Sequence, residues 1–213
     1  MSITGAFIVP HPPIILPQVG RGEEEKIRKT ADAYRKVAGR IAAMKPDVII
    51  LTSPHTTLYA DYFHISPGKG AKGDLRRFGA SGFSIEVAYD SELVEAISDE
   101  ADRAGIHAGT MGERDKGLDH GTLVPLYFIN QAYTDYKLVR IGLSGFTSLD
   151  HYRFGKLIAK TVEKLGRKAV FVASGDLSHK LLEDGPYGFA PEGPEFDDNV
   201  TQAMEKADFL SFL

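Results

Sequence analysis

The sequence predicts a single α/β domain with a mainly parallel central sheet flanked by helices. Three observations support this fold class. Apolar runs alternate with segments of helical spacing along the whole chain. The run Val48–Leu51 is wholly apolar, as in strands that are buried on both faces of a sheet. Neither a repeat nor a low-complexity linker divides the 213 residues. A chain of this length suits one large domain.

Strands are predicted where apolar runs end at loop-forming residues. The first strand, Ile3–Val9, ends before His11-Pro12-Pro13, and Val48–Leu51 ends at Thr52-Ser53-Pro54-His55. Three later apolar runs predict further strands at Phe83–Ala88, Lys137–Ser144 and Ala169–Ala173.

Helices are predicted between these strands from the spacing of their apolar residues. Acids at the start and bases further on favour a helix over Glu23–Met44. The other helices are expected at Ser91–Ala104 with Gly105 after its end, at Leu123–Gln131, at Leu149–Leu165 closed by Gly166, and from about Phe196. Ser66–Ser81 is rich in glycine and basic residues and is expected to be a mobile surface loop, and Gly117–Gly121 a second loop.

Composition excludes several kinds of protein. The absence of cysteine removes disulfides, thiolate nucleophiles and cysteine-bound metals, so a transition metal would rest on histidine and carboxylate ligands. With 25 basic and 29 acidic residues, the net charge of −4 argues against a nucleic-acid partner. No apolar run approaches the roughly 20 residues of a membrane span, and no secretory signal is visible, so a cytoplasmic protein is expected.

Two other chemistries are rejected because their motifs are incomplete. Gly68–Gly73 lacks the spacing of a phosphate-binding loop and does not join a strand to a helix. Ser178-His179 beside Asp176 is not accompanied by the GxSxG turn of a serine hydrolase.

Three of the seven histidines share one context. His11 follows the first predicted strand, His55 the second and His179 the last. The carboxyl ends of parallel strands converge on one ligand-binding edge, so these imidazoles are predicted to share a site there. The alternative is that each is a polar residue satisfied in its own loop. Prolines beside His11 and His55 stiffen both loops, which favours ligand binding.

The remaining histidines are less informative. His120 precedes Gly121, which allows a close backbone approach, and follows Asp119, which could either hold the imidazole ring or cap the next helix. His64 is expected in a strand or loop and is kept as a reserve ligand. His107 and His151 lie near predicted helix ends, where solvated or capping roles are expected.

Four ordered motifs resemble one family. The four motifs are Pro10-His11-Pro12-Pro13, Pro46–Ile50 running into Ser53-Pro54-His55, Asp119-His120-Gly121, and Gly175–His179. They are similar to motifs of the catalytic (LigB-like) subunit of class III extradiol ring-cleavage dioxygenases, and of the related Memo-like proteins. The resemblance implies that His11 and His55 bind a non-haem Fe(II). It further implies that His179 is the acid–base residue and that His120 contacts the substrate.

The resemblance also implies a small aromatic diol and O₂ as substrates, and an assembly either as a homo-oligomer or with a small partner subunit. Its third metal ligand would be a carboxylate well downstream of His179, where 34 residues follow. Because the chain ends on the apolar Asp208–Leu213, we expect an incomplete catalytic unit lacking its C-terminal part. The alternative function is a Memo-like metal-binding or redox-accessory protein. The carboxylates available after His179 include Glu183, Glu192, Glu195 and Glu205.

Overall fold

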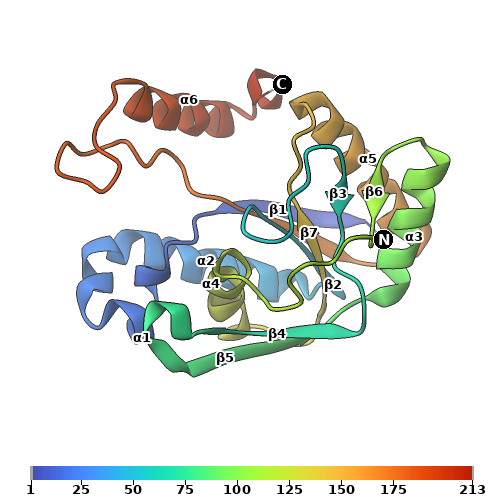
Figure 1. Cartoon of the computed structure of the whole chain (residues 1–213), viewed down its shortest axis with the longest axis horizontal. Coiled ribbons are helices and arrows are strands. Elements are labelled where there is room, and N and C mark those ends of the chain that lie inside the picture. Colours follow the sequence, from blue (N-terminus) through green and yellow to red (C-terminus); the bar gives the residue numbers. More distant parts are fainter. Residues whose placement is uncertain (1, 213) are drawn as a thin grey trace.

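A computed structural model describes residues 2–212, and the side chains of residues 2–210. A four-stranded sheet lies at its centre (Figure 1), and every neighbouring pair of strands is parallel. The predicted fold class is therefore confirmed. In spatial order the strands are β1 (Ile3–Val9), β8 (Ala169–Ser174), β2 (Val48–Ser53) and β7 (Lys137–Gly142).

The strand register brings the carboxyl ends to one edge. Val9 of β1 is level with Ser174 of β8, and Ser53 of β2 is level with Gly142 of β7. Segments that leave these ends therefore begin side by side, although they are far apart in the sequence.

Helices cover both faces of the sheet. Ile49 and Leu51 of β2 pack in one apolar cluster with α2 (Arg28–Met44) and α4 (His120–Asn130). The alternate residues of β2 belong to a second cluster with α3 (Ser91–Arg103) and α5 (Ser148–Lys164). Burial on both faces explains why β2 has an unbroken apolar sequence.

Local signals account for most helix ends. The Asp90 carboxylate accepts a hydrogen bond from the Leu93 N–H at the start of α3, and Thr147 accepts one from the Asp150 N–H at the start of α5. Gly105 and Gly166 follow these helices with positive φ angles of 66° and 65°. These two predicted helices are confirmed to within about one residue at each end.

The predicted helix over Glu23–Met44 begins differently. Its first part is the 3₁₀ segment η2 (Glu23–Ile27), and α2 starts at Arg28. Ile27 has φ −118° and ψ 29°, which interrupts the α-helical conformation between the two segments. Upstream, the chain forms η1 (Pro13–Ile15) and the short helix α1 (Pro17–Gly20).

The prediction of a mobile surface loop at Ser66–Ser81 is wrong. Gly70–Leu75 forms strand β4, which pairs antiparallel with β5 (Ala80–Ala88) through the 3₁₀ turn η3 (Arg76–Phe78). Glycine serves close packing here: a Cβ on Gly73 would lie 2.6 Å from the Leu118 Cβ and would overlap the Leu118 carbonyl. The predicted strand at Phe83–Ala88 is thus the second half of β5.

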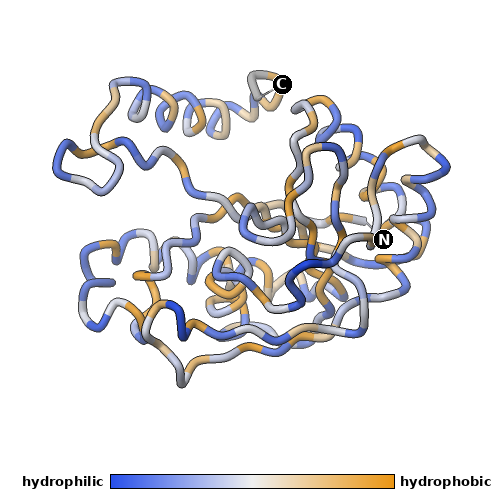
Figure 2. Tube along the Cα trace, in the orientation of Figure 1, coloured by the Kyte–Doolittle hydropathy of each residue, from blue (hydrophilic) through white to orange (hydrophobic). Residues whose placement is uncertain are grey.

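Other differences involve short or displaced elements. The two-residue strands β3 (Phe63–His64) and β6 (Ala108–Gly109) pair with each other and are too short for a periodicity signal. The last helix, α6 (Glu192–Lys206), starts four residues before the predicted Phe196. Figure 1 shows α6 well apart from the sheet, and Figure 2 shows hydrophobic and hydrophilic residues alternating along it.

The chain end is described only in part. Residues Phe209–Phe212 form the 3₁₀ segment η4, and Leu213, the last residue of the expected apolar end, lies outside the described residues. Within residues 2–212, none of the helices has the length and apolar character needed to cross a bilayer.

Candidate metal centre

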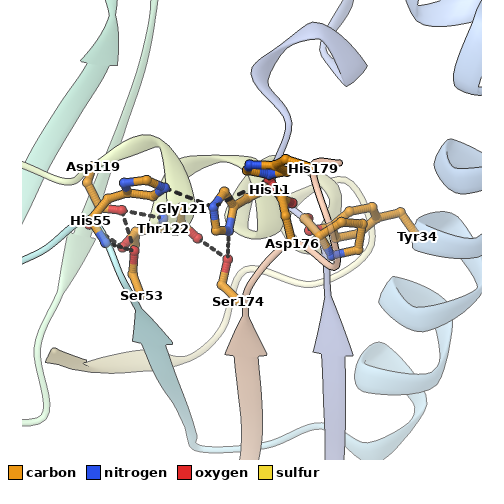
Figure 3. Close-up of polar contacts among 11 residues, drawn as sticks. His11, Tyr34, Ser53, His55, Asp119, Gly121, Thr122, Ser174, Asp176 and His179 are labelled. Atoms are coloured by element: carbon orange, nitrogen blue, oxygen red, sulfur yellow. Dashed lines mark hydrogen bonds and ion pairs between the residues drawn. The ribbon is translucent and has the colours of Figure 1, made fainter. Parts of the chain in front are cut away.

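Three histidines meet at the carboxyl edge of the sheet. His11 follows β1, His55 follows β2, and His120 is the first residue of α4. One ring nitrogen from each lies within 4.8 Å of the other two. The Nε2 atoms of His11 and His55 are 3.0 Å apart, the contact marked by a dashed line in Figure 3, and the two rings are nearly perpendicular. The ring centroids of His55 and His120 are 3.9 Å apart. We call these three residues the histidine cluster.

The histidine cluster is buried on one side and open on the other. His11 is buried, His120 is partly buried and His55 is exposed. Burial lowers the pKa of His11, although Asp176 acts in the opposite direction. Burial, reinforced by the nearby His55 and His11, lowers the pKa of His120 to about 4. Both imidazoles are therefore neutral at pH 7, as metal ligands must be.

A chain of hydrogen bonds selects the tautomer of His11. The Ser174 hydroxyl donates to the Gly121 carbonyl at 2.5 Å, so its oxygen can only accept from the His11 Nδ1, 2.9 Å away. The hydrogen of His11 then resides on Nδ1, and the Nε2 lone pair faces His55. The Gly121 carbonyl is free to accept because Pro125, four residues later in α4, has no N–H.

A second set of contacts joins His55 to the start of α4. The Ser53 hydroxyl donates to the Asp119 carboxylate at 2.6 Å and accepts from the His55 N–H at 3.2 Å. A Cβ on Gly121 would overlap the Ser53 hydroxyl and lie 3.3 Å from the His55 Cδ2, so this glycine permits the close approach that the sequence predicted.

Of the two interpretations of Asp119, the structure shows capping. Its Oδ1 accepts from the Thr122 N–H at 3.1 Å, and among the described residues its carboxylate makes no hydrogen bond to the His120 ring. Capping at Asp119 places His120 in the first turn of α4 rather than in the expected loop.

Asp176 lies between the histidine cluster and His179. Its Oδ1 accepts from the His11 backbone N–H at 2.7 Å, and its Oδ2 is 3.8 Å from the His11 Nε2 and 3.4 Å from the His179 Nε2. The His179 ring is half exposed and stacks on Tyr187 with centroids 4.9 Å apart. His179 therefore lies beside the histidine cluster but outside it.

The other residues considered from the sequence lie elsewhere. His64 is buried in β3, His107 is exposed, and the His151 Nδ1 is 2.9 Å from the carbonyl oxygen of Thr147, the residue that caps α5. None of these belongs to the cluster in the described part of the chain. The same holds for four exposed glutamates on the last loop and α6, namely Glu183, Glu192, Glu195 and Glu205.

Sequence reasoning missed Arg140, which supports the segment before His120. This side chain is 1% exposed and lies on β7. Its guanidinium donates to the carbonyls of Asp115 and Gly117 and lies 3.8 Å from the Asp119 carboxylate. A lone arginine inside the apolar run of β7 was the available signal, because a buried guanidinium requires several acceptors.

The donor set fits a transition metal. Two nitrogens 3.0 Å apart can be neighbouring ligands of one ion at the usual metal–nitrogen distance of about 2.0–2.1 Å. The hydrogen bond to Ser174 orients His11 in the way that outer partners orient metal-binding imidazoles. The Asp176 carboxylate adds negative charge nearby. Imidazole ligands suit iron, zinc, copper and nickel, so the cluster defines a candidate metal site without selecting the metal.

The sequence comparisons identify the class. A family described as the catalytic LigB subunit of aromatic ring-opening dioxygenase matches residues 5–213. This chain belongs to the LigB family, as its four histidine motifs predicted.

Individual relatives are similar over part of their length. The chain is 42% identical to protein CA_C1420 of Clostridium acetobutylicum over 213 residues, which cover 96% of this chain and 45% of that protein. It is 28% identical to the 2-aminophenol 1,6-dioxygenase beta subunit of a Pseudomonas species, covering 87% and 65%. It is 25% identical to the 3,4-dihydroxyphenylacetate 2,3-dioxygenase of Escherichia coli, covering 82% and 66%. The chain thus spans between about half and two thirds of these relatives.

Proposed function

We propose that this chain is the catalytic part of a non-haem Fe(II)-dependent extradiol dioxygenase, which opens a catechol-like ring beside its two hydroxyls with O₂. The convergence of His11, His55 and His120 at the open edge of a LigB-family sheet carries the proposal. The names of two relatives, which are dioxygenases of a 2-aminophenol and of a dihydroxyphenyl compound, support it.

The residues of the chain have separate roles in this proposal. His11 and His55 hold the metal through their facing Nε2 atoms, and Ser174 keeps His11 in the required tautomer. A ferrous ion there would supply a common binding site for the diol and O₂ and the redox chemistry between them. His120 is neutral at pH 7 and forms a hydrogen bond to a substrate oxygen.

Proton transfer is assigned to His179. Its half-exposed ring can take a proton from a substrate hydroxyl and later return it. Asp176, with Oδ2 3.4 Å from the His179 Nε2, orients the imidazole ring. The substrates are a small aromatic diol and O₂, and we propose assembly as a homo-oligomer or with a small partner subunit.

Paired substitutions test these roles. His179→Ala should retain the metal and lose about 10²–10⁴-fold in turnover, the usual effect of removing an acid–base group, whereas His55→Ala should lose the metal itself. Iron content by elemental analysis and O₂ uptake with catechol after anaerobic iron loading are the measurements. His107→Ala, at an exposed site outside the cluster, is the control. Equal iron loss in both variants would make His179 a ligand and contradict this assignment.

One observation favours the second candidate, a Memo-like metal-binding or redox-accessory protein. Within the described residues, the histidine cluster includes no carboxylate, whereas non-haem Fe(II) oxygenases commonly use two histidines and one carboxylate. Stable metal binding without O₂ uptake across neutral and carboxylated catechols would support this alternative over ring opening.

A further inference from the structure

The peptide bond between Pro10 and His11 lies just beyond the central sheet. The pairing of β1 with β8 ends at Val9, whose carbonyl accepts from the Gly175 N–H at 3.0 Å. From Pro10 to Pro13 the chain has only one backbone N–H, that of His11, because the other three residues are prolines. The position of His11 therefore depends on contacts from outside the strand ladder.

Two side chains hold this peptide bond, one at each of its polar groups. The Tyr34 hydroxyl donates to the Pro10 carbonyl, and Asp176 Oδ1 accepts from the His11 N–H at 2.7 Å. The His11 ring is held separately by its Nδ1 contact with Ser174. Three side chains from distant parts of the sequence thus fix the backbone and the ring of one cluster histidine.

Tyr34 itself is firmly placed. It lies on α2, is 3% exposed, and stacks its ring on Phe128 of α4 with centroids 4.3 Å apart and planes 13° apart. Because α4 begins with His120, Tyr34 contacts the helix that carries one cluster histidine and the backbone next to another. It therefore links the positions of His120 and His11, whose ring centroids are 5.4 Å apart.

We propose that Tyr34 is a positioning residue of the metal centre. Its hydroxyl fixes the Pro10–His11 peptide and so keeps the His11 Nε2 in place, 3.0 Å from that of His55. A ligand that is already held in its binding position loses less conformational freedom when the metal binds. Removal of the hydroxyl therefore weakens metal binding, although Tyr34 touches no metal ligand side chain. This inference rests on the metal site of the proposed function and is independent of ring opening.

The alternative is that Tyr34 only fills the interior between α2 and α4. Tyr34→Phe separates the two roles, because phenylalanine retains the ring that stacks on Phe128 and loses only the hydrogen bond to Pro10. Tyr133→Phe is the matched control. The Tyr133 hydroxyl also donates to a prolyl carbonyl, that of Pro46 at 3.1 Å, but this contact precedes β2 and lies at the opposite edge of the sheet from the histidine cluster.

Anaerobic titration of the metal-free protein with Fe(II) measures affinity, and amide hydrogen exchange measures the protection of the His11 N–H. We expect Tyr34→Phe to bind Fe(II) about 3–30-fold more weakly, somewhat less than the loss of about 10–100-fold that follows removal of a direct partner of a metal-bound imidazole. The His11 N–H should exchange several-fold faster, since the peptide is held on one side only. Tyr133→Phe should change neither quantity.

The outcomes separate this inference from the proposed function. A Tyr34→Phe protein that binds Fe(II) within about twofold of the unsubstituted protein overturns the positioning role. Equal losses of affinity in Tyr34→Phe and Tyr133→Phe overturn it as well, because the effect would then follow from stability alone. If the unsubstituted chain binds no Fe(II), the proposed function fails, and unchanged protection of the His11 N–H in Tyr34→Phe would then overturn this inference by itself.

Discussion

Replacing Ser174 by alanine should weaken metal binding without touching a metal ligand. The hydroxyl of Ser174 links the Gly121 carbonyl to the His11 Nδ1, and the serine is 5% exposed. Alanine has nearly the same size, so the strand should keep its packing. The substitution leaves a ring nitrogen and a carbonyl without a partner, and it frees His11 to place its hydrogen on Nε2, where it opposes metal binding.

The structure allows the size of the effect to be worked out. Loss of a hydrogen-bonding partner from a metal-bound histidine typically lowers metal affinity about 10–100-fold, which corresponds to about 1.4–2.7 kcal/mol. Each buried polar group left unpaired costs about 1–3 kcal/mol of folding free energy. The His11 Nδ1 and the Gly121 carbonyl each lose a partner, so we expect the free energy of unfolding to fall by at least about 2 kcal/mol.

Isothermal titration with Fe(II) under anaerobic conditions measures the affinity, and urea unfolding of the metal-free protein measures the stability. Ser144→Ala is the control, since Ser144 follows β7 and its hydroxyl accepts from the Phe146 N–H rather than contacting a histidine. A Ser174→Ala protein that is folded and binds Fe(II) within twofold of the unsubstituted protein would refute the tautomer argument.

Two further predictions concern packing and pH. Gly121→Ala should displace Ser53 and His55 and reduce metal affinity at least 10-fold in the same titration, because its Cβ has no room; an unchanged affinity would show that the two loops can separate freely. His64 is fully buried, its ring nitrogens have no hydrogen-bond partner in the described structure, and burial lowers its pKa to about 4. The unfolded chain, with a histidine pKa of 6.5, therefore binds a proton more readily, and this residue should destabilise the fold by about 3 kcal/mol as the pH falls from 6.5 to 4. In urea unfolding, His64→Leu should reduce the loss of unfolding free energy between pH 6.5 and pH 4, and His107→Leu, at an exposed position, is the control. An unchanged dependence of the unfolding free energy on pH in His64→Leu would contradict the assignment of this loss to His64.

Strands, helices and the family were accessible from the sequence because their signals are local. The wholly apolar run of β2 reflects burial on both faces, and the caps at Asp90 and Thr147 are formed by the residues beside them. The glycine-rich hairpin was misread for the same reason. Gly70 and Gly73 are needed because a Cβ there would overlap the backbone of Val87 and Leu118. Nothing in the neighbouring sequence distinguishes glycines required for close packing from glycines that make a loop flexible.

By itself, the sequence determined that His11, His55 and His179 follow strands and that His120 stands beside a helix start, because strand ends, prolines and caps are short-range features. Only the tertiary structure decided which of these imidazoles meet. It joined His120 to His11 and His55, placed His179 at the side, and brought Phe78 and Ser174 to the cluster. These contacts cross 163 positions between His11 and Ser174 and 53 between Ser174 and Gly121. Strand order and register decide which residues meet across such sequence separations. Both depend on the packing of the whole chain and leave no local pattern in the sequence.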